Sequence, residues 1–281
     1  MYIFISDFFI EDGILGGGEL NNDEFIKIVE QKGEKVTKIK SSLVTLSFLK
    51  KNKGSKYIVS NFVTLPKPCL DYLLNHEKYV IYEHDHKYLP NRDPSIFKDY
   101  TAPKNLIINY EFYKQAVATF CQSSLHKEVV EKNLDLTNVH NLSGNLWSKK
   151  TLELITNLNL GKQKTELYSI MHSQNPTKNA DNCIKYCFFK KIPYVLIPHM
   201  KYHDFLSELS KHKGLIFFPN VIETLNRVCV EARMLNCEVV TNKKVGATSE
   251  EWFSLKGDKL IKEVYKMRDR IPEQILGAFN E

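Results

Sequence analysis

The sequence predicts an α/β protein made of two similar units, each with a parallel β-sheet whose strands are joined by helices. Short apolar runs alternate with amphipathic stretches along the chain, which is typical of parallel strands with crossover helices. A polar stretch at residues 156–166 interrupts the alternation, which then starts again. The 281 residues are enough for two small domains that each bury a core. We therefore expect two units that face one another, over residues 1–158 and 159–281.

The apolar runs define the expected strands in chain order. In the first unit they cover residues 2–6, 35–40, 56–61, 78–85, 105–110 and 116–123, with 139–142 as a weaker seventh. In the second unit they cover residues 166–172, 193–198, 215–219 and 238–242, and residues 256–279 are expected to form a final helix. Ligands of such folds gather at the carboxyl ends of the strands, so we look for chemistry in the loops that follow them.

Composition excludes several classes of protein. Hydrophobic residues make up 43% and charged residues 26% of the chain, which indicates a folded globular protein and neither a disordered nor a fibrous one. The net charge of +6 suits phosphate-bearing ligands or an anionic membrane surface, but it is spread along the chain. Because the sequence shows no basic stripe interleaved with aromatic residues, we do not expect nucleic-acid binding.

The cysteines and the apolar runs indicate a cytoplasmic protein. The six cysteines include no CxxC pair and lie in segments that we expect to be buried, which fits reduced thiols. The first ten residues are apolar but contain Asp7 and lack a basic leader, so we interpret them as a strand and not as a signal peptide. No run approaches the roughly 20 apolar residues of a membrane span, which leaves at most a peripheral membrane contact.

Two glutamates eight residues apart, Glu223 and Glu231, follow the expected strand at residues 215–219. Thr224 is a plausible N-cap, and Leu225 begins a set of apolar residues at helical spacing. Glu231 would then lie about two turns inside a helix, about 12 Å from Glu223. That distance is comparable to the reach of a nucleotide sugar from its ribose to its hexose.

A helix start between two carboxylates suits such a ligand. The unpaired N–H groups and the positive dipole end can bind a diphosphate. A carboxylate can accept two hydroxyl hydrogen bonds from a vicinal diol. On this interpretation Glu231 binds the ribose and Glu223 binds hydroxyls of the donor sugar. The alternative is that both are ordinary solvated helix acids, and spacing alone does not exclude it.

The surrounding residues resemble the donor-binding segment of GT-B glycosyltransferases of the family 4 type, the glycosyltransferases group 1. The matching pieces, in order, are Phe218-Pro219-Asn220, Glu223, Glu231-Ala232, Asn236-Cys237-Glu238-Val239-Val240, and Gly246 with Glu250. The match covers about thirty residues. The resemblance implies a GT-B fold of two Rossmann-like domains across a cleft. It also implies donor phosphates near the helix start at Thr224 and Leu225.

A second, weaker match lies after the first strand of the second unit. The family places there a Gly-Arg pair and, a few residues later, a lysine that binds the diphosphate. Lys178 falls on the lysine position, whereas His172 and Ser173 replace the Gly-Arg pair, so one of two expected cations is missing. The alternative for Lys178 is one solvated lysine among 39 basic residues.

The first unit offers two further candidates. Gly16, Gly17 and Gly18, followed by Glu19, resemble the GGxE loop that family members place near the donor phosphates, where glycines allow close backbone approach. A flexible turn is one alternative, and a dinucleotide fingerprint is another, although Asn21 stands where its third glycine is wanted.

His84, after the strand at residues 78–85, is the best match to a histidine that family members direct into the cleft. The alternatives are a polar loop that bonds its own backbone, and a metal pair of His84 with His86, which requires the strand to continue.

We therefore predict a hexosyltransferase that uses a nucleotide diphosphate sugar as its donor substrate and needs no other cofactor. The resemblance implies transfer with retention of configuration, with Glu223, His84 and Lys178 as catalytic residues. No Asp-x-Asp occurs in the chain, which favours a metal-independent reaction and predicts no metal site. The C-terminal helix would pack back on the first domain. The donor base, the sugar and the acceptor stay open, and lipid, protein, glycan and nucleic-acid acceptors are all compatible with the sequence.

A different class of function stays open as well. The missing arginine, and a chain that is short for two domains, are compatible with a non-catalytic nucleotide or sugar binding protein on a GT-B scaffold.

Overall fold

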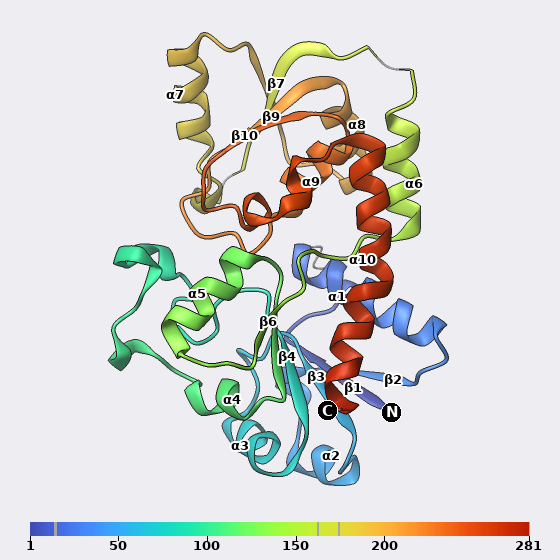
Figure 1. Ribbon diagram of the computed structural model, residues 1–281, viewed down its shortest axis with the longest axis vertical. Coiled ribbons are helices and arrows are strands. Elements are labelled where there is room, and N and C mark those ends of the chain that lie inside the picture. Colours follow the sequence, from blue (N-terminus) through green and yellow to red (C-terminus); the bar gives the residue numbers. More distant parts are fainter. Residues whose placement is uncertain (14–15, 162, 174, 281) are drawn as a thin grey trace. The chain divides into compact units, whose positions relative to one another are not determined.

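The structure is a computed structural model, and it describes residues 1–13, 16–161, 163–173 and 175–280 (Figure 1). The chain divides into two compact units. Unit 1 comprises Met1–Leu146 and Met267–Glu281, and unit 2 comprises Trp147–Lys266. The border expected after residue 158 coincides with the end of a helix, whereas the compact units divide before that helix begins.

Unit 1 contains a six-stranded parallel sheet in the order β2-β1-β3-β4-β5-β6. Its strands are β1 (Tyr2–Ser6), β2 (Val36–Lys40), β3 (Lys56–Val59), β4 (Tyr79–Tyr82), β5 (Ala118–Cys121) and β6 (Val139–Asn141). Its helices are α1 (Gly17–Gln31), α2 (Leu46–Lys51), α3 (Lys67–His76), α4 (Tyr110–Gln115) and α5 (Ser124–Leu134). The strand order reverses at β1, which has β2 on one side and β3 on the other. This is the topological switch point at which open α/β sheets bind ligands.

Unit 2 contains a four-stranded parallel sheet in the order β10-β9-β7-β8. Its strands are β7 (Thr165–Met171), β8 (Tyr194–Ile197), β9 (His212–Phe217) and β10 (Glu238–Thr241). Its helices are α6 (Lys149–Leu158), α7 (Ala180–Lys190), α8 (Tyr202–Ser210) and α9 (Arg227–Met234). Helix α7 covers one face of the sheet, and α6, α8 and α9 lie on the other (Figure 1). The switch point lies between β7 and β9.

Helix α10 (Gly257–Gly277) begins in unit 2, and from Met267 its residues belong to unit 1. Short 3₁₀ helices complete the described structure: η1 (Ile10–Asp12), η2 (Ser41–Leu43), η3 (Pro94–Ile96), η4 (Lys98–Tyr100), η5 (Lys104–Leu106), η6 (Pro176–Lys178), η7 (Gly246–Ser249), η8 (Glu251–Ser254) and η9 (Ala278–Asn280). None of the helices in the described part of the chain is long and apolar enough to cross a membrane.

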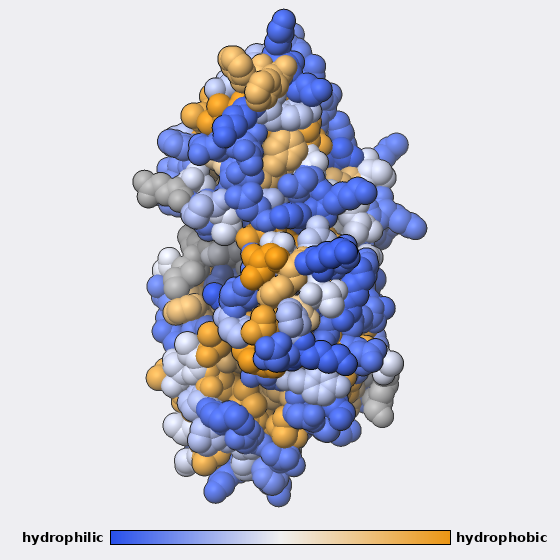
Figure 2. Space-filling view, turned by 90° about the vertical axis from the view of Figure 1, so that its left-hand side faces the viewer, coloured by the Kyte–Doolittle hydropathy of each residue, from blue (hydrophilic) through white to orange (hydrophobic). Residues whose placement is uncertain are grey.

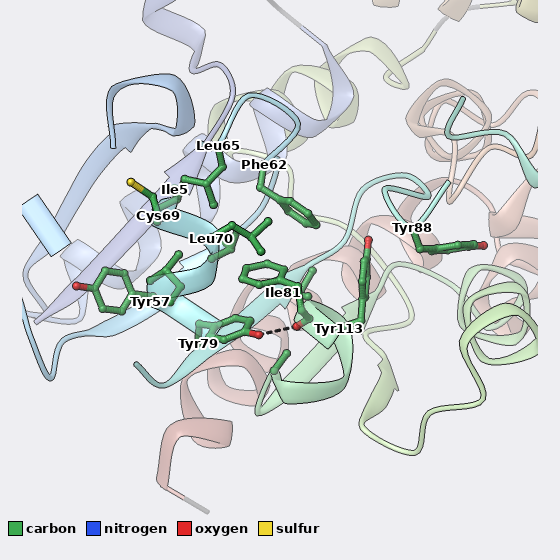
Figure 3. Close-up of a cluster of buried hydrophobic side chains, with 14 of the residues drawn as sticks. Ile5, Tyr57, Phe62, Leu65, Cys69, Leu70, Tyr79, Ile81, Tyr88 and Tyr113 are labelled. Carbon is green, nitrogen blue, oxygen red and sulfur yellow. Dashed lines mark hydrogen bonds between the residues drawn. The ribbon is translucent and has the colours of Figure 1, made fainter. Parts of the chain in front are cut away.

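The core of unit 1 explains why its strands are nearly continuous apolar runs. The side chains of Ile5, Tyr57 and Ile81 are fully buried between the sheet and its helices (Figure 3). A parallel sheet covered on both faces needs apolar residues at successive positions. The buried Tyr79 hydroxyl donates a hydrogen bond of 2.6 Å to the carbonyl oxygen of Phe112, so its polar atom is satisfied inside the core.

One expected strand is wrong. Residues 105–110 form the end of η5, a loop and the first residue of α4. Leu106 and Ile108 stay 38% and 40% exposed, and Asn109 has a left-handed backbone with φ 57°. The Ile108 N–H donates to the carbonyl oxygen of Tyr88 at 2.8 Å, in a loop contact outside the sheet. A short apolar run does not by itself distinguish a strand from a loop that packs on the surface.

Candidate functional site

Two loops of unit 2 meet at its switch point. Lys178, at the end of η6 after β7, forms an ion pair with Glu223, which follows β9, at 2.7 Å between Nζ and Oε1. The two side chains are 28% and 16% exposed, so the pair is partly accessible to solvent. The Asn220 N–H donates to the carbonyl oxygen of Thr177 at 3.0 Å, which ties the two loops together next to the pair. The structure thus brings together two residues that the sequence predicts separately.

The loop after β10 holds Glu223 from the other side. The Glu223 N–H donates to the carbonyl oxygen of Lys244 at 2.8 Å, and the Gly246 N–H donates to the carbonyl oxygen of Glu223 at 2.8 Å. The Ala247 N–H donates to the carbonyl oxygen of Leu225 at 3.0 Å. These backbone bonds hold the backbone of Glu223 against the loop that contains Gly246.

Helix α9 begins later than the sequence predicts. Asn226, and not Thr224, is the N-cap, and its side chain accepts a hydrogen bond from the Cys229 N–H at 2.9 Å. Leu225 precedes the helix, and its side chain is buried, with 1% exposed. Glu231 therefore lies just over one turn inside the helix, and the expected distance of about 12 Å does not apply because residues 223–226 are not helical.

Glu231 is buried, with 1% of its surface exposed, and it belongs to a second polar group in unit 2. Its Oε1 accepts hydrogen bonds from the Trp147 indole N–H at 2.8 Å and from the Tyr202 hydroxyl at 2.6 Å. The Arg227 Nε lies 3.7 Å from the same oxygen, and the guanidinium stacks 4.3 Å from the centroid of the Trp147 ring. Sequence reasoning did not identify these three residues.

The second carboxylate oxygen of Glu231 differs from the first. Among the described residues Oε2 has no hydrogen-bond partner, although it is buried. An orphaned buried acceptor is costly unless something binds it. Burial raises the pKa of the Glu231 carboxyl, and the neighbouring cation and hydrogen-bond donors offset only part of this rise. Glu231 therefore has one oxygen held by three neighbouring side chains and one buried oxygen without a partner among the described residues.

In unit 1 the structure brings Gly18 and His84 together. Gly16 is the N-cap of α1, and Gly17 and Gly18 form the start of its first turn. A Cβ on Gly18 would lie 3.6 Å from Cγ of His84, in ordinary van der Waals contact. The carboxylate of Glu19 turns back against Gly16, where a Cβ would lie 2.3 Å from its Oε2. This places an acidic side chain at the helix start, and burial raises the pKa of that carboxyl.

The His84 ring is fixed on both sides. Its Nε2 lies 2.7 Å from Oδ1 of Asn22, and its Nδ1 is hydrogen bonded to the side-chain amide nitrogen of Gln122. The Asn22 amide nitrogen donates to the hydroxyl of Ser60 at 2.9 Å, which orients Oδ1 towards the ring. Since the Gln122 nitrogen can only donate, the His84 proton lies on Nε2. Ser60 directly follows β3, so this group lies at the switch point of unit 1.

The neighbouring charged residues of the loop after β4 are buried. Glu83 is fully buried, and its Oε1 accepts hydrogen bonds from the N–H groups of His84 at 3.1 Å and Asp85 at 2.9 Å and from the buried Lys87. Its Oε2 accepts a hydrogen bond from the Tyr113 hydroxyl. Burial raises the pKa of Glu83 to about 7, although Lys87 acts in the opposite direction.

The possible metal pair of His84 and His86 does not form. His84 is held by side-chain amides, and the fully buried His86 has its Nδ1 3.0 Å from the hydroxyl of Tyr88. Nowhere in residues 1–13, 16–161, 163–173 and 175–280 do three or more His, Cys, Asp or Glu side chains form a group suited to a metal ion. All six cysteines are buried free thiols.

Comparison with known proteins identifies the architecture. No protein-family model matches the sequence, and no curated protein matches it significantly. Among solved structures, the catalytic domain of Arabidopsis thaliana starch synthase IV, bound to ADP and acarbose, superposes with a TM-score of 0.61 at 8% identity, covering 98% of this chain and 94% of that one.

Two further structures match over similar lengths. The UDP-forming α,α-trehalose-phosphate synthase from Burkholderia vietnamiensis gives a TM-score of 0.56 at 9% identity, over 97% of this chain and 88% of that one. Anabaena HepE, in complex with UDP and glucose, gives 0.54 at 13% identity, over 99% and 91%. These matches confirm the predicted fold class, while membership of family 4 stays a prediction. The chain is an α/β protein of two Rossmann-like units with the GT-B fold.

Proposed function

We propose that this chain transfers a glycosyl group from a nucleotide diphosphate sugar, and that unit 2 binds the donor. The carrying observation is the Lys178–Glu223 pair, whose nitrogen and oxygen lie 2.7 Å apart where β7 and β9 end. A cation and a carboxylate at the switch point of a parallel sheet match the two ends of such a donor, the diphosphate and the sugar hydroxyls. The matching starch synthase structure contains ADP and the matching HepE structure contains UDP and glucose, which supports a nucleotide-linked donor.

Each residue of the unit 2 site has a proposed role. Lys178 binds the diphosphate and offsets the charge that develops on it as the sugar leaves. Glu223 accepts hydrogen bonds from sugar hydroxyls once Lys178 turns to the phosphate. The backbone at Thr224 and Leu225 leads to the start of α9 at Arg227, where the positive end of the helix dipole favours an anion.

Glu231 is the proposed ribose residue. Its Oε2 has two lone-pair directions and can accept hydrogen bonds from both hydroxyls of a vicinal diol. Because that atom is buried, a ribose reaches it only after a neighbouring side chain moves. This makes donor binding dependent on local rearrangement, which costs part of the binding energy.

The finer mechanism is part of the proposal. Retention of configuration and independence of metal ions follow from the sequence resemblance and from the absence of Asp-x-Asp in the chain. Gly16, Gly17, Gly18 and His84 stay predicted participants from unit 1. Their proposed contribution is a close backbone approach and the ring N–H at Nε2 of His84, which would exchange its bond to Asn22 for one to the substrate.

The second candidate is a nucleotide or sugar binding protein without turnover. It is favoured by His172 and Ser173, which stand where the resemblance calls for Gly and Arg. Ser173 accepts a hydrogen bond of 3.1 Å from the Asn175 N–H and so closes a local turn. That position then provides no cation to the leaving diphosphate.

The test combines ligand binding with turnover. UDP, GDP, ADP and their common sugar conjugates are added to the wild type, and the shift in melting temperature is measured. A ligand at about 100 times its dissociation constant stabilises the folded form by roughly 2.7 kcal/mol. Hydrolysis or transfer of the best donor is then followed by release of the nucleoside diphosphate.

Matched variants locate the binding. Glu231→Gln keeps an acceptor for Trp147 and Tyr202 but replaces the free oxygen, and Glu223→Gln removes the charge beside Lys178. Each should weaken donor binding by roughly 10- to 100-fold, the worth of a hydrogen bond to a charged group. Glu166→Gln, on a glutamate with 81% of its side chain exposed, is the control and should leave binding unchanged. Donor binding without turnover supports the second candidate, and no binding by the wild type refutes both.

A further inference from the structure

Helix α7 ends in an exposed aromatic pair. Phe188 and Phe189 are each 78% exposed, and their rings pack against one another at 5.8 Å between centroids. The opposite side of the helix is anchored, since Cys183 and Cys187 are buried in the core of unit 2. Two neighbouring phenylalanines in water lose the free energy that burial would give them, so this surface favours a partner that removes them from water.

Strand β8 adds apolar area on the same face of the sheet. Tyr194 and Leu196 are 38% and 37% exposed, and they pair in register with Tyr168 and Ile170. Paired residues of a parallel sheet point to the same face, and Ile170 belongs to the core cluster that contains residues of α7. In Figure 2, which faces the side of unit 2 where α7 lies, hydrophobic side chains stand at the surface among hydrophilic ones.

The charge of this segment has one sign. Residues 182–203 contain four lysines, Lys185, Lys190, Lys191 and Lys201, and no aspartate or glutamate. Lys185 lies three and four residues before the aromatic pair, so it shares their side of the helix, and Lys190 and Lys191 follow them directly. Lysines at a helix C-terminus also stabilise its dipole, but that effect does not account for exposed phenylalanines beside them.

Of the partners that could cover this surface, an anionic membrane fits best. Pairing of a strand from another protein with the edge of β8 is disfavoured, because β8 has only four residues. It also lies between Pro193 and Pro198, which have no N–H to donate to a neighbouring strand. The two phenylalanine rings meet at 77° and so present no flat platform for stacked bases. Exposed apolar side chains with lysines next to them are the combination that binds to the headgroup layer of anionic lipids.

We propose that the α7–β8 surface, defined by Phe188, Phe189, Tyr194, Leu196 and the three lysines of α7 and its C-cap, Lys185, Lys190 and Lys191, docks unit 2 on an anionic lipid bilayer. The aromatic pair enters the boundary between headgroups and acyl chains, and the lysines contact lipid phosphates. This inference does not depend on glycosyl transfer.

The test measures binding of the full chain to vesicles by co-sedimentation. We expect binding to vesicles of phosphatidylcholine mixed with phosphatidylglycerol, weaker binding to phosphatidylcholine alone, and loss of binding at high salt. Phe188→Ser/Phe189→Ser should weaken binding at least about tenfold. Lys190→Glu/Lys191→Glu should weaken it by about fivefold or more for each lysine.

Matched controls separate this surface from charge and hydrophobicity in general. Lys149→Glu/Lys150→Glu makes the same charge change on exposed residues of α6, and Ile96→Ser removes an apolar side chain that is 63% exposed in unit 1. Both controls should bind vesicles like the wild type. Equal losses in the controls and in the α7 variants overturn the proposal.

A direct readout uses Phe188→Trp. The native Trp147 and Trp252 are buried, so the new tryptophan is the one that lipid can reach. Its emission should be quenched by brominated phosphatidylcholine in anionic vesicles. Binding without quenching, or no vesicle binding by the wild type, refutes the proposal. Two other results also refute the proposal, provided that the wild type does not bind vesicles. One is salt-sensitive binding of an oligonucleotide that the Phe188→Ser/Phe189→Ser variant loses, and the other is self-association that this variant loses.

Discussion

Each unit has a Lys–Glu ion pair in a loop that follows a strand, and the two pairs differ mainly in burial. In unit 1 the side chains of Lys87 and Glu83 are 1% and 0% exposed. In unit 2 those of Lys178 and Glu223 are 28% and 16% exposed. A buried pair that loses one partner leaves an uncompensated charge in a medium that solvates it poorly, whereas a partly exposed pair can exchange its partner for water or a ligand. The same two residue types therefore form a buried structural pair in unit 1 and a partly accessible pair in unit 2, to which we have assigned ligand binding as a proposal.

The largest expected effect is on the buried pair. Lys87→Met should lower the free energy of unfolding by about 3–5 kcal/mol, because Glu83 is left buried without its cation. The raised pKa of Glu83, about 7, sets the pH dependence. A carboxyl with a folded pKa above its unfolded value stabilises the fold at low pH and loses that contribution as pH rises through about 7.

Removing the cation raises that pKa further, so the loss in Lys87→Met should be larger at pH 8 than at pH 5. Urea denaturation at both pH values measures this loss of stability. The double variant Lys87→Met/Glu83→Gln should recover most of the stability, and a double variant as unstable as the single one contradicts this account.

A smaller effect is expected from the buried histidine of the same loop. Burial lowers the pKa of His86 to about 4. Since the unfolded state binds the proton near pH 6.5, the contribution of His86 is present above that value and is lost as pH falls towards 4. The wild type should therefore lose about 2 kcal/mol more than His86→Leu between pH 7 and pH 5. The free energy of unfolding of both proteins is measured by urea denaturation at the two pH values. An equal loss in the wild type and in His86→Leu would show that His86 is protonated in the folded state at pH 5.

The strands and loops show how much of the fold the sequence could predict. The alternation of apolar runs predicts both parallel sheets, because a buried strand needs a local run of residues and nothing from elsewhere in the chain. Residues 105–110 instead form a loop, in which the Ile108 N–H donates to the carbonyl oxygen of Tyr88, a residue distant in sequence. No local pattern contains that contact.

The residues of the candidate site also divide into those that a local sequence pattern reveals and those that it does not. Lys178 and Glu223 are found from their places after strands, since the ends of parallel strands meet at one edge. Arg227 precedes Glu231 by four residues and could have been found as a helical pair. Trp147 and Tyr202 could not, because they reach Glu231 from 84 and 29 residues away along the chain.

The start of α9 gives the next prediction. Thr224 and Asn226 are both suitable caps, and asparagine is favoured because its backbone is at φ 72°, where β-branched residues are strained. Asn226→Ala should cost about 1–2 kcal/mol, from the lost bond to Cys229 and the strained backbone. Asn226→Gly, which tolerates that backbone, should cost only a few tenths. Thermal unfolding of the two variants measures the difference, and equal losses would mean that the backbone at this position relaxes.

The smallest change in stability is expected for the exposed pair. Lys178→Met should alter the free energy of unfolding by less than about 1 kcal/mol, because Glu223 can be solvated in its place. Lys213→Met is the control, since its pair with Glu166 at 2.8 Å is exposed in the same unit and lies away from the switch point. Both variants should unfold like the wild type, but Lys178→Met should lose the stabilisation by a nucleoside diphosphate that Lys213→Met retains. A loss of several kcal/mol in Lys178→Met would show that this pair, like the one in unit 1, is part of the structure, and the diphosphate would then need another cation.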